Sequence, residues 1–362
     1  MDDSAERDSA DSDAATAAIA APDAASHRSQ PLLEIVQLKT YFHTEHGLAR
    51  AVDGVSFSVP RGKTLAVVGE SGCGKTVTAL TILRLIPIPP GEIVDGRIQF
   101  EGRDLLALDA AELQEIRGGD IAMIFQEPAT SLNPVFTIGN QIAEAIRLHR
   151  DVPEAEVRDE VLKALSEVRM SEPERRIDQY PHELSGGMKQ RAMIAMALSC
   201  KPKLLIADEP TTALDVTIQA RILDLLRKSQ NEHGMSILLI THDLGVVAEM
   251  ADDVVVMYAG KVVERAEVRP LFARPLHPYT QGLFSSLVRV DRHQDRLQAI
   301  EGSVPAPTNF PTGCRFRARC ALYESKGKPE KCTEQPPLAE IEAGHWSACW
   351  FADELAKQKG SP

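Results

Sequence analysis

A glycine-rich turn joins an apolar run to a helix-forming segment in the first quarter of the chain. The turn reads GESGCGKT over residues 69–76, with TLAVV before it and VTALTILRLI after it. Glycines let the backbone wrap so that successive N–H groups point inward, and the next helix directs its positive end to the same place. The spacing G-x-x-x-x-G-K-[ST] between a strand and a helix predicts a phosphate-binding loop, and a turn without a ligand is the weaker interpretation.

Short continuous apolar runs alternate with helical stretches from Leu33 onward. The runs are IAMIF, KLLIADE, SILLITHD and DVVVMY. Apolar runs without polar alternation are typical of strands that are covered on both faces of a parallel sheet. We therefore expect an α/β fold of the P-loop NTPase type, with a mostly parallel sheet core, a helical insertion and a Cys-containing C-terminal extension.

Composition divides the chain into three parts. Residues 1–30 are mainly Ala, Ser and Asp, which predicts a disordered acidic tail. Residues 31–265 carry the nucleotide-binding motifs, and the stretch from about 127 to 184 has amphipathic helical signals and little strand character. Residues 266–362 become rich in Pro, Arg and Cys, and we expect a second domain there.

The overall charge and hydropathy exclude two classes of protein. The 362 residues carry a formal net charge of -12, whereas broad nucleic-acid binding leaves a basic footprint. No apolar run approaches the ~18 residues of a membrane span. We therefore expect a soluble chain without a nucleic-acid partner, which leaves docking onto a membrane protein open.

Charged and hydroxyl groups at two strand ends suit the chemistry of a nucleoside triphosphate. Lys75 carries the charge that neutralises β- and γ-phosphates, and the Thr76 hydroxyl is a ligand for Mg²⁺. The apolar run LLIA ends in Asp208 and Glu209, and buried carboxylates are costly unless they meet a cation. Asp208 suits Mg²⁺ coordination, whereas Glu209 suits polarising the water that attacks the γ-phosphate.

Two more polar residues follow apolar runs. Gln126 follows IAMIF, where it is placed to reach Mg²⁺ or the attacking water, and the helical insertion begins beside it. His242 follows ILLIT and is placed to hydrogen-bond the γ-phosphate. Read singly, each is more simply explained as a solvated strand-end residue or a neighbour of a helix cap.

The tripeptide Ser185-Gly186-Gly187 stands at the mouth of an apolar helix. Free N–H groups and a hydroxyl at a helix start form an anion site, here without a lysine. One nucleotide has one terminal phosphate, which the loop at 69–76 already holds. The tripeptide therefore predicts contact with a nucleotide on another subunit, although a plain helix cap is the simpler interpretation of this stretch alone.

The order of these motifs resembles the ATP-binding-cassette (ABC) family over about residues 33–265. GESGCGKT resembles its phosphate loop, LSGGMKQ its signature and LLIADE its second nucleotide motif. Gln126 matches the Q-loop, His242 the switch histidine, and Ala213-Leu214-Asp215 the D-loop. Met188 stands where the family signature usually has Gln.

The resemblance implies a set of site residues. An aromatic residue before the phosphate loop stacks on adenine in the family; Tyr41 and Phe42 are the candidates, and Phe42 is favoured. The implied ATP contacts in the loop are Gly69, Ser71, Gly72, Cys73, Gly74, Lys75, Thr76 and Val77. The implied Mg²⁺ contacts are Thr76, Gln126 and Asp208, and the implied catalytic residues are Gln126, Glu209 and His242. The implied contacts with a partner's ATP are Ser185, Gly186, Gly187, Lys189 and Gln190, and the D-loop contributes Asp215.

The resemblance also implies an assembly. Two chains face each other head to tail with two ATP molecules between them, and each ATP lies between one phosphate loop and the other chain's signature. ATP binding closes the pair and hydrolysis reopens it. The helical insertion, joined through Gln126, passes this motion to a membrane subunit.

The C-terminal extension resembles that of ATP-binding subunits from bacterial dipeptide and oligopeptide importers. LFARPLHPYTQGLFSSL over 271–287 carries a His-Pro-Tyr signature at 277–279, and EGSVPAPTNFPTGCRFRARC follows at 301–320. This implies an ATPase that energises peptide import, paired with a second ABC ATPase subunit, two transmembrane permease subunits and an extracytoplasmic peptide-binding protein. Its expected place is the cytoplasmic face of the cell membrane, as a peripheral subunit. A nickel or other solute importer of the same group is the alternative, and a soluble ABC ATPase acting on DNA or ribosomes is a more distant one.

Four of the six cysteines lie close together in the extension, at Cys314, Cys320, Cys332 and Cys349. The reducing cytoplasm, where ATP is found, disfavours disulfides, and four thiols suggest a soft metal centre. The close Cys pair typical of zinc is absent, although His345 keeps a mixed zinc site open. We expect a [4Fe–4S] cluster, to which the importer resemblance also points, with zinc as the alternative and free or disulfide-bonded cysteines as the third possibility.

Overall fold

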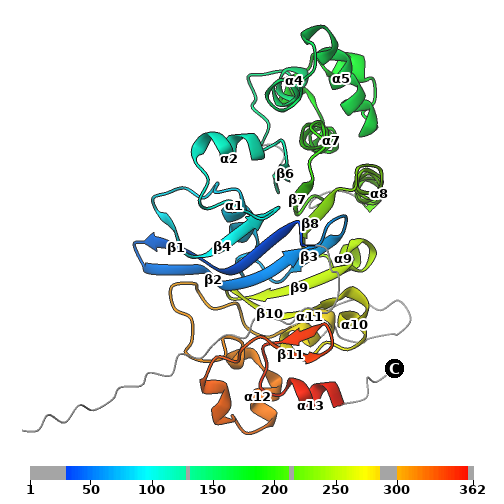
Figure 1. Cartoon of the computed structure of the whole chain (residues 1–362). Helices are drawn as coiled ribbons and strands as arrows, with labels where there is room; N and C mark the ends of the chain where they lie inside the picture. Colours follow the sequence, from blue (N-terminus) through cyan, green and yellow to red (C-terminus); the bar gives the residue numbers. More distant parts are fainter. Residues whose placement is uncertain (1–29, 128–130, 212–215, 286–299, 358–362) are drawn as a thin grey trace, which may run out of the picture.

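Two β-sheets organise the computed structural model, which describes residues 30–127, 131–211, 216–285 and 300–357 (Figure 1). The predicted tail, apart from residue 30, and the predicted D-loop residue Asp215 lie outside the described residues. One sheet has four strands in the order β2-β1-β4-β5, and the other has eight in the order β11-β12-β10-β9-β3-β8-β7-β6. The larger sheet runs through the middle of the molecule and carries the nucleotide-binding motifs.

The centre of the larger sheet is parallel. Its neighbouring strands β6–β7, β7–β8, β8–β3 and β3–β9 all pair in parallel. Every residue of β3, β7 and β8 is buried, as the unbroken apolar runs predict. These strands are β3 (Thr64–Val68), β6 (Ile121–Ile124), β7 (Leu204–Asp208), β8 (Ser236–Ile240) and β9 (Asp253–Tyr258). The predicted α/β fold with a mostly parallel core is confirmed.

The smaller sheet is antiparallel and covers one side of that core. It consists of β1 (Leu33–Thr44), β2 (Gly47–Val59), β4 (Gly91–Phe100) and β5 (Arg103–Asp104). Leu33, Ile35 and Leu38 of β1 are at most 1% exposed and pack in one cluster with residues of α1 (Lys75–Ile82). Helix α1, which follows the phosphate loop, is thereby held next to both sheets.

The predicted insertion is a helical lobe at the top of Figure 1. Within the described part of 127–184 the regular elements are helical, and α7 completes the lobe. Apolar side chains of α4, α5 and α7 form one cluster with residues of β6 and β7. The elements are α4 (Ile138–His149), α5 (Glu154–Glu167), α6 (Pro173–Arg176), η1 (Pro181–Glu183) and α7 (Gly186–Leu198).

The other helices cover the core or build the extension. Those beside the core are α2 (Ala110–Ile116), α8 (Val216–His233) and α9 (Leu244–Met250). Those of the extension are α10 (Val268–Ala273), α11 (Pro278–Ser285), η2 (Arg317–Arg319), α12 (Ala321–Ser325), η3 (Glu330–Thr333) and α13 (Ala352–Lys357). Among the helices of the described ranges, none combines the length and the apolar composition that crossing a bilayer requires.

The extension continues the larger sheet. Strand β10 (Lys261–Glu267) pairs antiparallel with β9 on one side and with β12 (His345–Ser347) on the other, and β11 (Ala339–Glu342) follows at the edge. The predicted boundary between residues 265 and 266 therefore falls inside a strand. The division into two domains stays a prediction, but the two regions share one sheet.

A buried carboxylate joins β10 to the start of the His-Pro-Tyr segment. Glu264 is fully buried and accepts the backbone N–H groups of Leu276 and His277, the latter at 3.0 Å. His345 Nε2 lies 2.7 Å from Glu264 Oε1. Burial lowers the pKa of His277 to about 3, so the ring is neutral, and its Nδ1 accepts the N–H of Tyr279. These bonds fix the path of the chain from residue 276 to 279.

Glu264→Leu should lower the free energy of unfolding by about 3 kcal/mol, because two buried N–H groups and His345 lose their acceptor. Urea denaturation would measure the change. Glu354→Gln, which breaks only the solvent-exposed pair with Lys326, should cost less than about 1 kcal/mol. Equal losses in the two variants would contradict the structural role of Glu264.

The buried His277 should make stability pH-dependent. Below the ordinary pKa of 6.5 the unfolded chain binds a proton at His277 that the folded chain refuses down to about pH 3. Stability is thus lost as pH falls through 6.5, by about 1.4 kcal/mol per pH unit from this group. His277→Gln should remove that slope in urea titrations between pH 6.5 and 5, whereas His46→Gln in an exposed turn should leave it unchanged. A retained slope in His277→Gln would contradict the assignment.

Candidate nucleotide site

The phosphate loop connects β3 to α1 through glycines that no other residue replaces without strain. Gly69 and Gly74 have φ values of +154° and +106°. A Cβ at Gly69 would lie 2.3 Å from the carbonyl oxygen of Met257, and one at Gly74 would lie 2.4 Å from that of Ala51. The loop is therefore pressed against neighbouring backbone on one side, which leaves its other side for a ligand.

The side chains of the loop divide into exposed and buried groups. Ser71, Gly72 and Thr76 are exposed, whereas Cys73 is fully buried and burial raises the pKa of its thiol. Lys75 is only 6% exposed, and its Nζ donates to the carbonyl oxygens of Gly69 at 2.8 Å and Glu70 at 3.1 Å. The lysine charge is therefore held inside the loop, where phosphate oxygens would meet it. Val77 is half-buried in α1.

Asp208, the last residue of β7, supplies an unsatisfied carboxylate beside the loop. It is 1% exposed, and its Oδ1 has no hydrogen-bond partner among the described residues. Burial raises the pKa of Asp208, while a hydrogen bond from Thr76 and the charge of Lys75 oppose the rise. A buried carboxylate next to a threonine hydroxyl is the oxygen donor set that Mg²⁺ prefers. Thr76 and Asp208 therefore fit the predicted Mg²⁺ site.

The three predicted catalytic residues come together at the carboxyl ends of β6, β7 and β8. Gln126 Nε2 donates to Glu209 Oε2 at 3.1 Å, and His242 Nδ1 lies 3.1 Å from Glu209 Oε1. The Glu209 backbone has φ +49°, and its N–H donates to the carbonyl of Ile240. The Glu209 side chain is 14% exposed and that of His242 is 61% exposed. The parallel sheet thus assembles residues from three distant segments around one carboxylate.

The signature residues stand at the start of α7, as predicted. Ser185 is the N-cap and accepts the N–H of Met188 at 3.4 Å. A Cβ at Gly186 would meet nothing within 4 Å, so this end of the helix faces open space. Lys189 is half-exposed, but Gln190 is 3% exposed and its Nε2 donates to the carbonyl of Pro210 at 2.6 Å. Gln190 therefore joins α7 to the segment that follows Glu209 in the same chain.

The two aromatic candidates occupy neighbouring positions of β1, where its pairing with β2 is irregular. The Tyr41 hydroxyl donates to Asp53 Oδ1 at 2.7 Å, and burial together with this bond raises the pKa of Tyr41 to about 12. Phe42 pairs with Gly91, whose Cβ, if present, would lie 3.1 Å from the Phe42 ring. The preference for Phe42 as the stacking residue stays a prediction.

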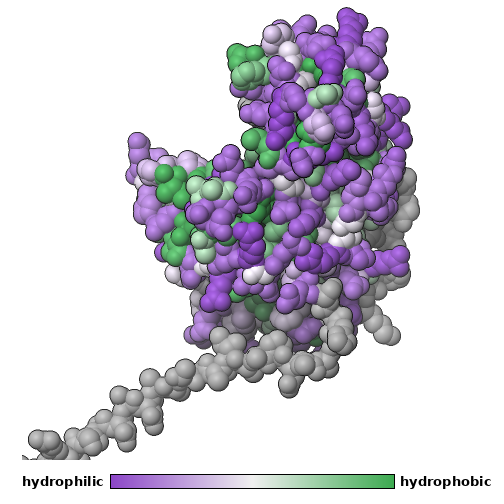
Figure 2. Space-filling view, turned by 45° about the horizontal axis from the view of Figure 1, so that its top comes forward, coloured by the Kyte–Doolittle hydropathy of each residue, from purple (hydrophilic) through white to green (hydrophobic). Residues whose placement is uncertain are grey.

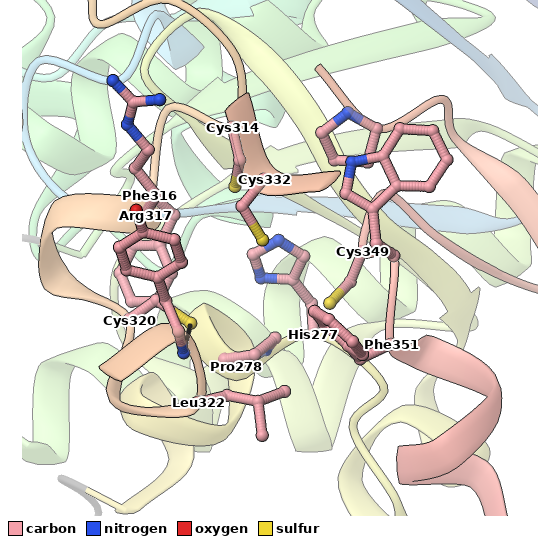
Figure 3. A pocket seen from close by; sticks show the side chains of 13 residues that line it. His277, Pro278, Cys314, Phe316, Arg317, Cys320, Leu322, Cys332, Cys349 and Phe351 are labelled. Carbon is pink, nitrogen blue, oxygen red and sulfur yellow. Dashed lines mark hydrogen bonds between the residues drawn. The ribbon is translucent and has the colours of Figure 1, made fainter. Parts of the chain in front are cut away.

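The predicted iron–sulfur cluster is wrong. Cys314, Cys320, Cys332 and Cys349 do line one pocket, around His277 (Figure 3). The described ranges, which include all four cysteines, contain no group of three or more His, Cys, Asp or Glu side chains that can hold a metal ion. The prediction of a metal centre, [4Fe–4S] or zinc, is therefore corrected.

The four thiols lie in an apolar environment. Burial in the largely apolar pocket raises the pKa of Cys314 to about 11 and that of Cys349 to about 12, and it raises those of Cys320 and Cys332 as well. His345, the other proposed zinc ligand, is bound to Glu264, and all six cysteines are free.

Sequence reasoning did not predict that three residues of the extension contact the region of the nucleotide site. Tyr279 and Arg319 contact Glu70 of the phosphate loop, and Arg315 contacts Asp53. Arg315 and Arg319 lie in CRFRARC, a run without helical or strand periodicity. No local signal in that run indicates a contact with a loop about 250 residues earlier in the chain.

Two family models match the chain. The model described as "ABC transporter" matches residues 52–212, and the one described as "Oligopeptide/dipeptide transporter, C-terminal region" matches residues 263–326. The first covers the phosphate loop and Asp208, and the second covers the His-Pro-Tyr segment and Arg319.

Relatives are similar over nearly their whole length. A probable peptide ABC transporter ATP-binding protein, y4tR of Sinorhizobium fredii, is 52% identical over 326 residues, which cover 90% of this chain and 96% of the relative. The oligopeptide transport ATP-binding protein AppD of Bacillus subtilis is 51% identical over 324 residues, which cover 89% of this chain and 97% of AppD.

Solved structures resemble the cassette part. The ATP-binding cassette MJ0796, solved as a dimer with ADP and Pi, has a TM-score of 0.60 and 26% identity and covers 66% of this chain and 99% of its own. The cassette cbiO1 from Clostridium perfringens has a TM-score of 0.57 and 28% identity, and it covers 68% of this chain and 92% of its own. The phosphate loop, the carboxylate pair and these similarities together place the chain in the ABC transporter family, as an ATPase subunit with an oligopeptide/dipeptide-type C-terminal region.

Proposed function

We propose that this chain hydrolyses Mg–ATP to energise the import of di- and oligopeptides through a membrane transporter. The observation that carries the proposal is the contact of Gln126 and His242 with Glu209 beside an intact phosphate loop, in a chain with the peptide-transporter extension. The names of y4tR and AppD give the substrate class, peptides.

Each polar residue of the site has a task in hydrolysis. Lys75 and the loop N–H groups bind the phosphates, and Thr76 and Asp208 hold Mg²⁺, which neutralises phosphate charge when bound. Glu209 orients and polarises the attacking water. Gln126 and His242 each contact one oxygen of that carboxylate and so hold its orientation. His242, whose side chain is 61% exposed, is the residue that we expect to contact the γ-phosphate.

A second chain completes each ATP site in this proposal. Ser185 and Gly186 lie at an exposed helix start in the upper lobe, where a partner's triphosphate would meet the N–H groups of α7. Lys189, Gln190 and Asp215 belong to the same proposed surface, although Gln190 is bound to Pro210 in this structure. The cassette MJ0796 was solved as a dimer, which supports a face-to-face pair. The partner that we propose is a second, different ABC ATPase subunit.

An exposed apolar patch offers a contact for two transmembrane permease subunits. Phe125, Val135 and Phe136 are 37%, 70% and 50% exposed and lie between β6 and α4, next to Gln126. Figure 2 shows apolar residues on both sides of the notch between the helical lobe and the lobe of β1 and β4. Exposed apolar patches mark interaction sites. We place the chain at the cytoplasmic face of the membrane, in a transporter that receives peptides from an extracytoplasmic binding protein.

Two alternatives to the proposed peptide importer can be tested by transport experiments. A nickel or other solute importer of the same group would share every residue discussed here, because cargo selection lies in other subunits. A soluble ABC ATPase acting on DNA or ribosomes would need a basic surface, whereas this chain has a net charge of -12. Uptake of labelled dipeptides, oligopeptides and Ni²⁺ by vesicles that contain the complete transporter separates these cases. Uptake of Ni²⁺ without peptide uptake would overturn the proposed cargo.

Glu209→Gln should retain ATP binding but lower ATP turnover and peptide uptake by at least about 100-fold, because the amide cannot polarise water. Vesicles with the complete transporter allow both rates to be measured together. Glu324→Gln, an exposed carboxylate in α12, is the matched control and should leave both rates unchanged. Normal turnover in Glu209→Gln would remove Glu209 from the mechanism.

Phe136→Asp should weaken association with the permease subunits by at least about tenfold, because it places a charge in the apolar contact. Co-purification from membranes and a binding titration would measure it, and ATP binding by the separate chain should stay unchanged. Leu148→Asp is the control, since Leu148 is 61% exposed at the far end of α4. If both variants bind alike, the patch is not the docking surface.

A further inference from the structure

We propose that the C-terminal extension holds the phosphate loop in its ATP-binding conformation, with Tyr279 and Arg319 as positioning residues. The inference rests on ATP binding by the family and not on the identity of the cargo. Both residues contact Glu70, the second residue of the loop, from segments 209 and 249 residues away in the sequence.

Tyr279 binds the loop backbone. Its hydroxyl accepts the N–H of Glu70 at 2.8 Å, and the side chain is fully buried. The ring is packed against Tyr258 and Phe316, with centroids 4.6 Å and 5.4 Å away. The backbone of Tyr279 is fixed in turn by its hydrogen bond to His277 Nδ1. A rigidly held hydroxyl therefore defines where the loop begins.

Arg319 binds the side chain of the same loop residue. Its Nη1 and Nη2 donate to the two carboxylate oxygens of Glu70 at 2.6 Å and 2.9 Å. The Arg319 side chain is 5% exposed, its Nε donates to the carbonyl of Glu301, and the pair with Glu70 raises the pKa of Arg319. A two-point contact between a planar guanidinium and a carboxylate fixes orientation as well as distance.

Glu70 passes this constraint to the lysine that meets the phosphates. Its carbonyl oxygen accepts hydrogen bonds from Lys75 Nζ at 3.1 Å and from the N–H of Cys73 at 3.3 Å. The extension thus holds Glu70 from outside, while Lys75 and Cys73 are bound to it from within the loop. Loss of the outer contacts would let the carbonyl move, and the resting place of Lys75 with it.

The segment that contains Arg319 also contacts strand β2 and the turn after β9 through Arg315. Arg315 is paired with Asp53 and donates to the carbonyl of Ala259, and Asp53 accepts the hydroxyl of Tyr41. Arg315 is 8% exposed. Two arginines four residues apart therefore contact the phosphate loop, strand β2 and the turn after β9.

The test compares ATP affinity with stability in the full chain. Titration with a fluorescent ATP analogue and Mg²⁺ gives the Kd, and urea denaturation gives the stability of the same samples. Arg319→Gln and Glu70→Gln should each raise the Kd at least about fivefold. The double variant should have nearly the same Kd as either single variant, because both substitutions remove the same Arg319–Glu70 contact. Tyr279→Phe, which removes only the hydroxyl, should raise the Kd about threefold with the fold intact.

Matched controls lie within the extension. Arg274→Lys alters a pair with Glu342 that has both partners in the extension, and Tyr323→Phe alters a tyrosine of α12. Both should keep the wild-type Kd. An unchanged Kd in folded Tyr279→Phe and Arg319→Lys would overturn the inference, as would additive effects of Arg319→Gln and Glu70→Gln. Peptide uptake by the wild-type transporter is measured separately. If the transporter does not import peptides, the comparison of Kd values for ATP still tests the role of the extension.

Discussion

Parallel pairing in the larger sheet is the constraint on which the site depends. Because β3, β8, β7 and β6 run in one direction, their carboxyl ends lie at a single edge, where the phosphate loop, Asp208, Glu209, Gln126 and His242 all follow. The burial of these strands also has a cost, since Asp208 enters the protein with an unpaired oxygen. A bound cation would offset that cost by interacting with the Asp208 carboxylate. Strand β7 therefore both completes the sheet and supplies a ligand for Mg²⁺.

Most of the site residues were predicted from short motifs that are contiguous in the sequence. The phosphate loop is a turn between a strand and a helix that follow each other directly in the sequence. Its glycines and Lys75 could therefore be identified from their spacing alone. Glu209, Gln126 and His242 each follow a recognisable strand, and parallel order then brings them together. Contacts between segments that are distant in the sequence have no such signal, which is why the contacts of Arg319 and Tyr279 with Glu70 were not predicted.

The cysteines are a case in which a clear sequence pattern led to a wrong prediction. Their number and spacing predicted a metal centre, but a metal site also depends on the three-dimensional environment in which the side chains meet, and the described residues contain no group of three or more that can hold a metal ion. Spacing along the chain does not report that environment. The shared sheet was not predicted for a related reason, because the change in composition near residue 266 does not say whether the next segment adds a strand to the previous sheet.

The outer strands supplied by the extension have a practical consequence. In the full chain β12 covers the free edge of β10, and β11 beyond it is short and carries Glu340 and Glu342. Short, charged edge strands resist pairing with other molecules. A shortened chain that stops near residue 265 would expose the hydrogen-bonding groups of β10 and the apolar surface behind it. Such a fragment would be prone to aggregation, so the cassette of this protein is best handled with its extension attached.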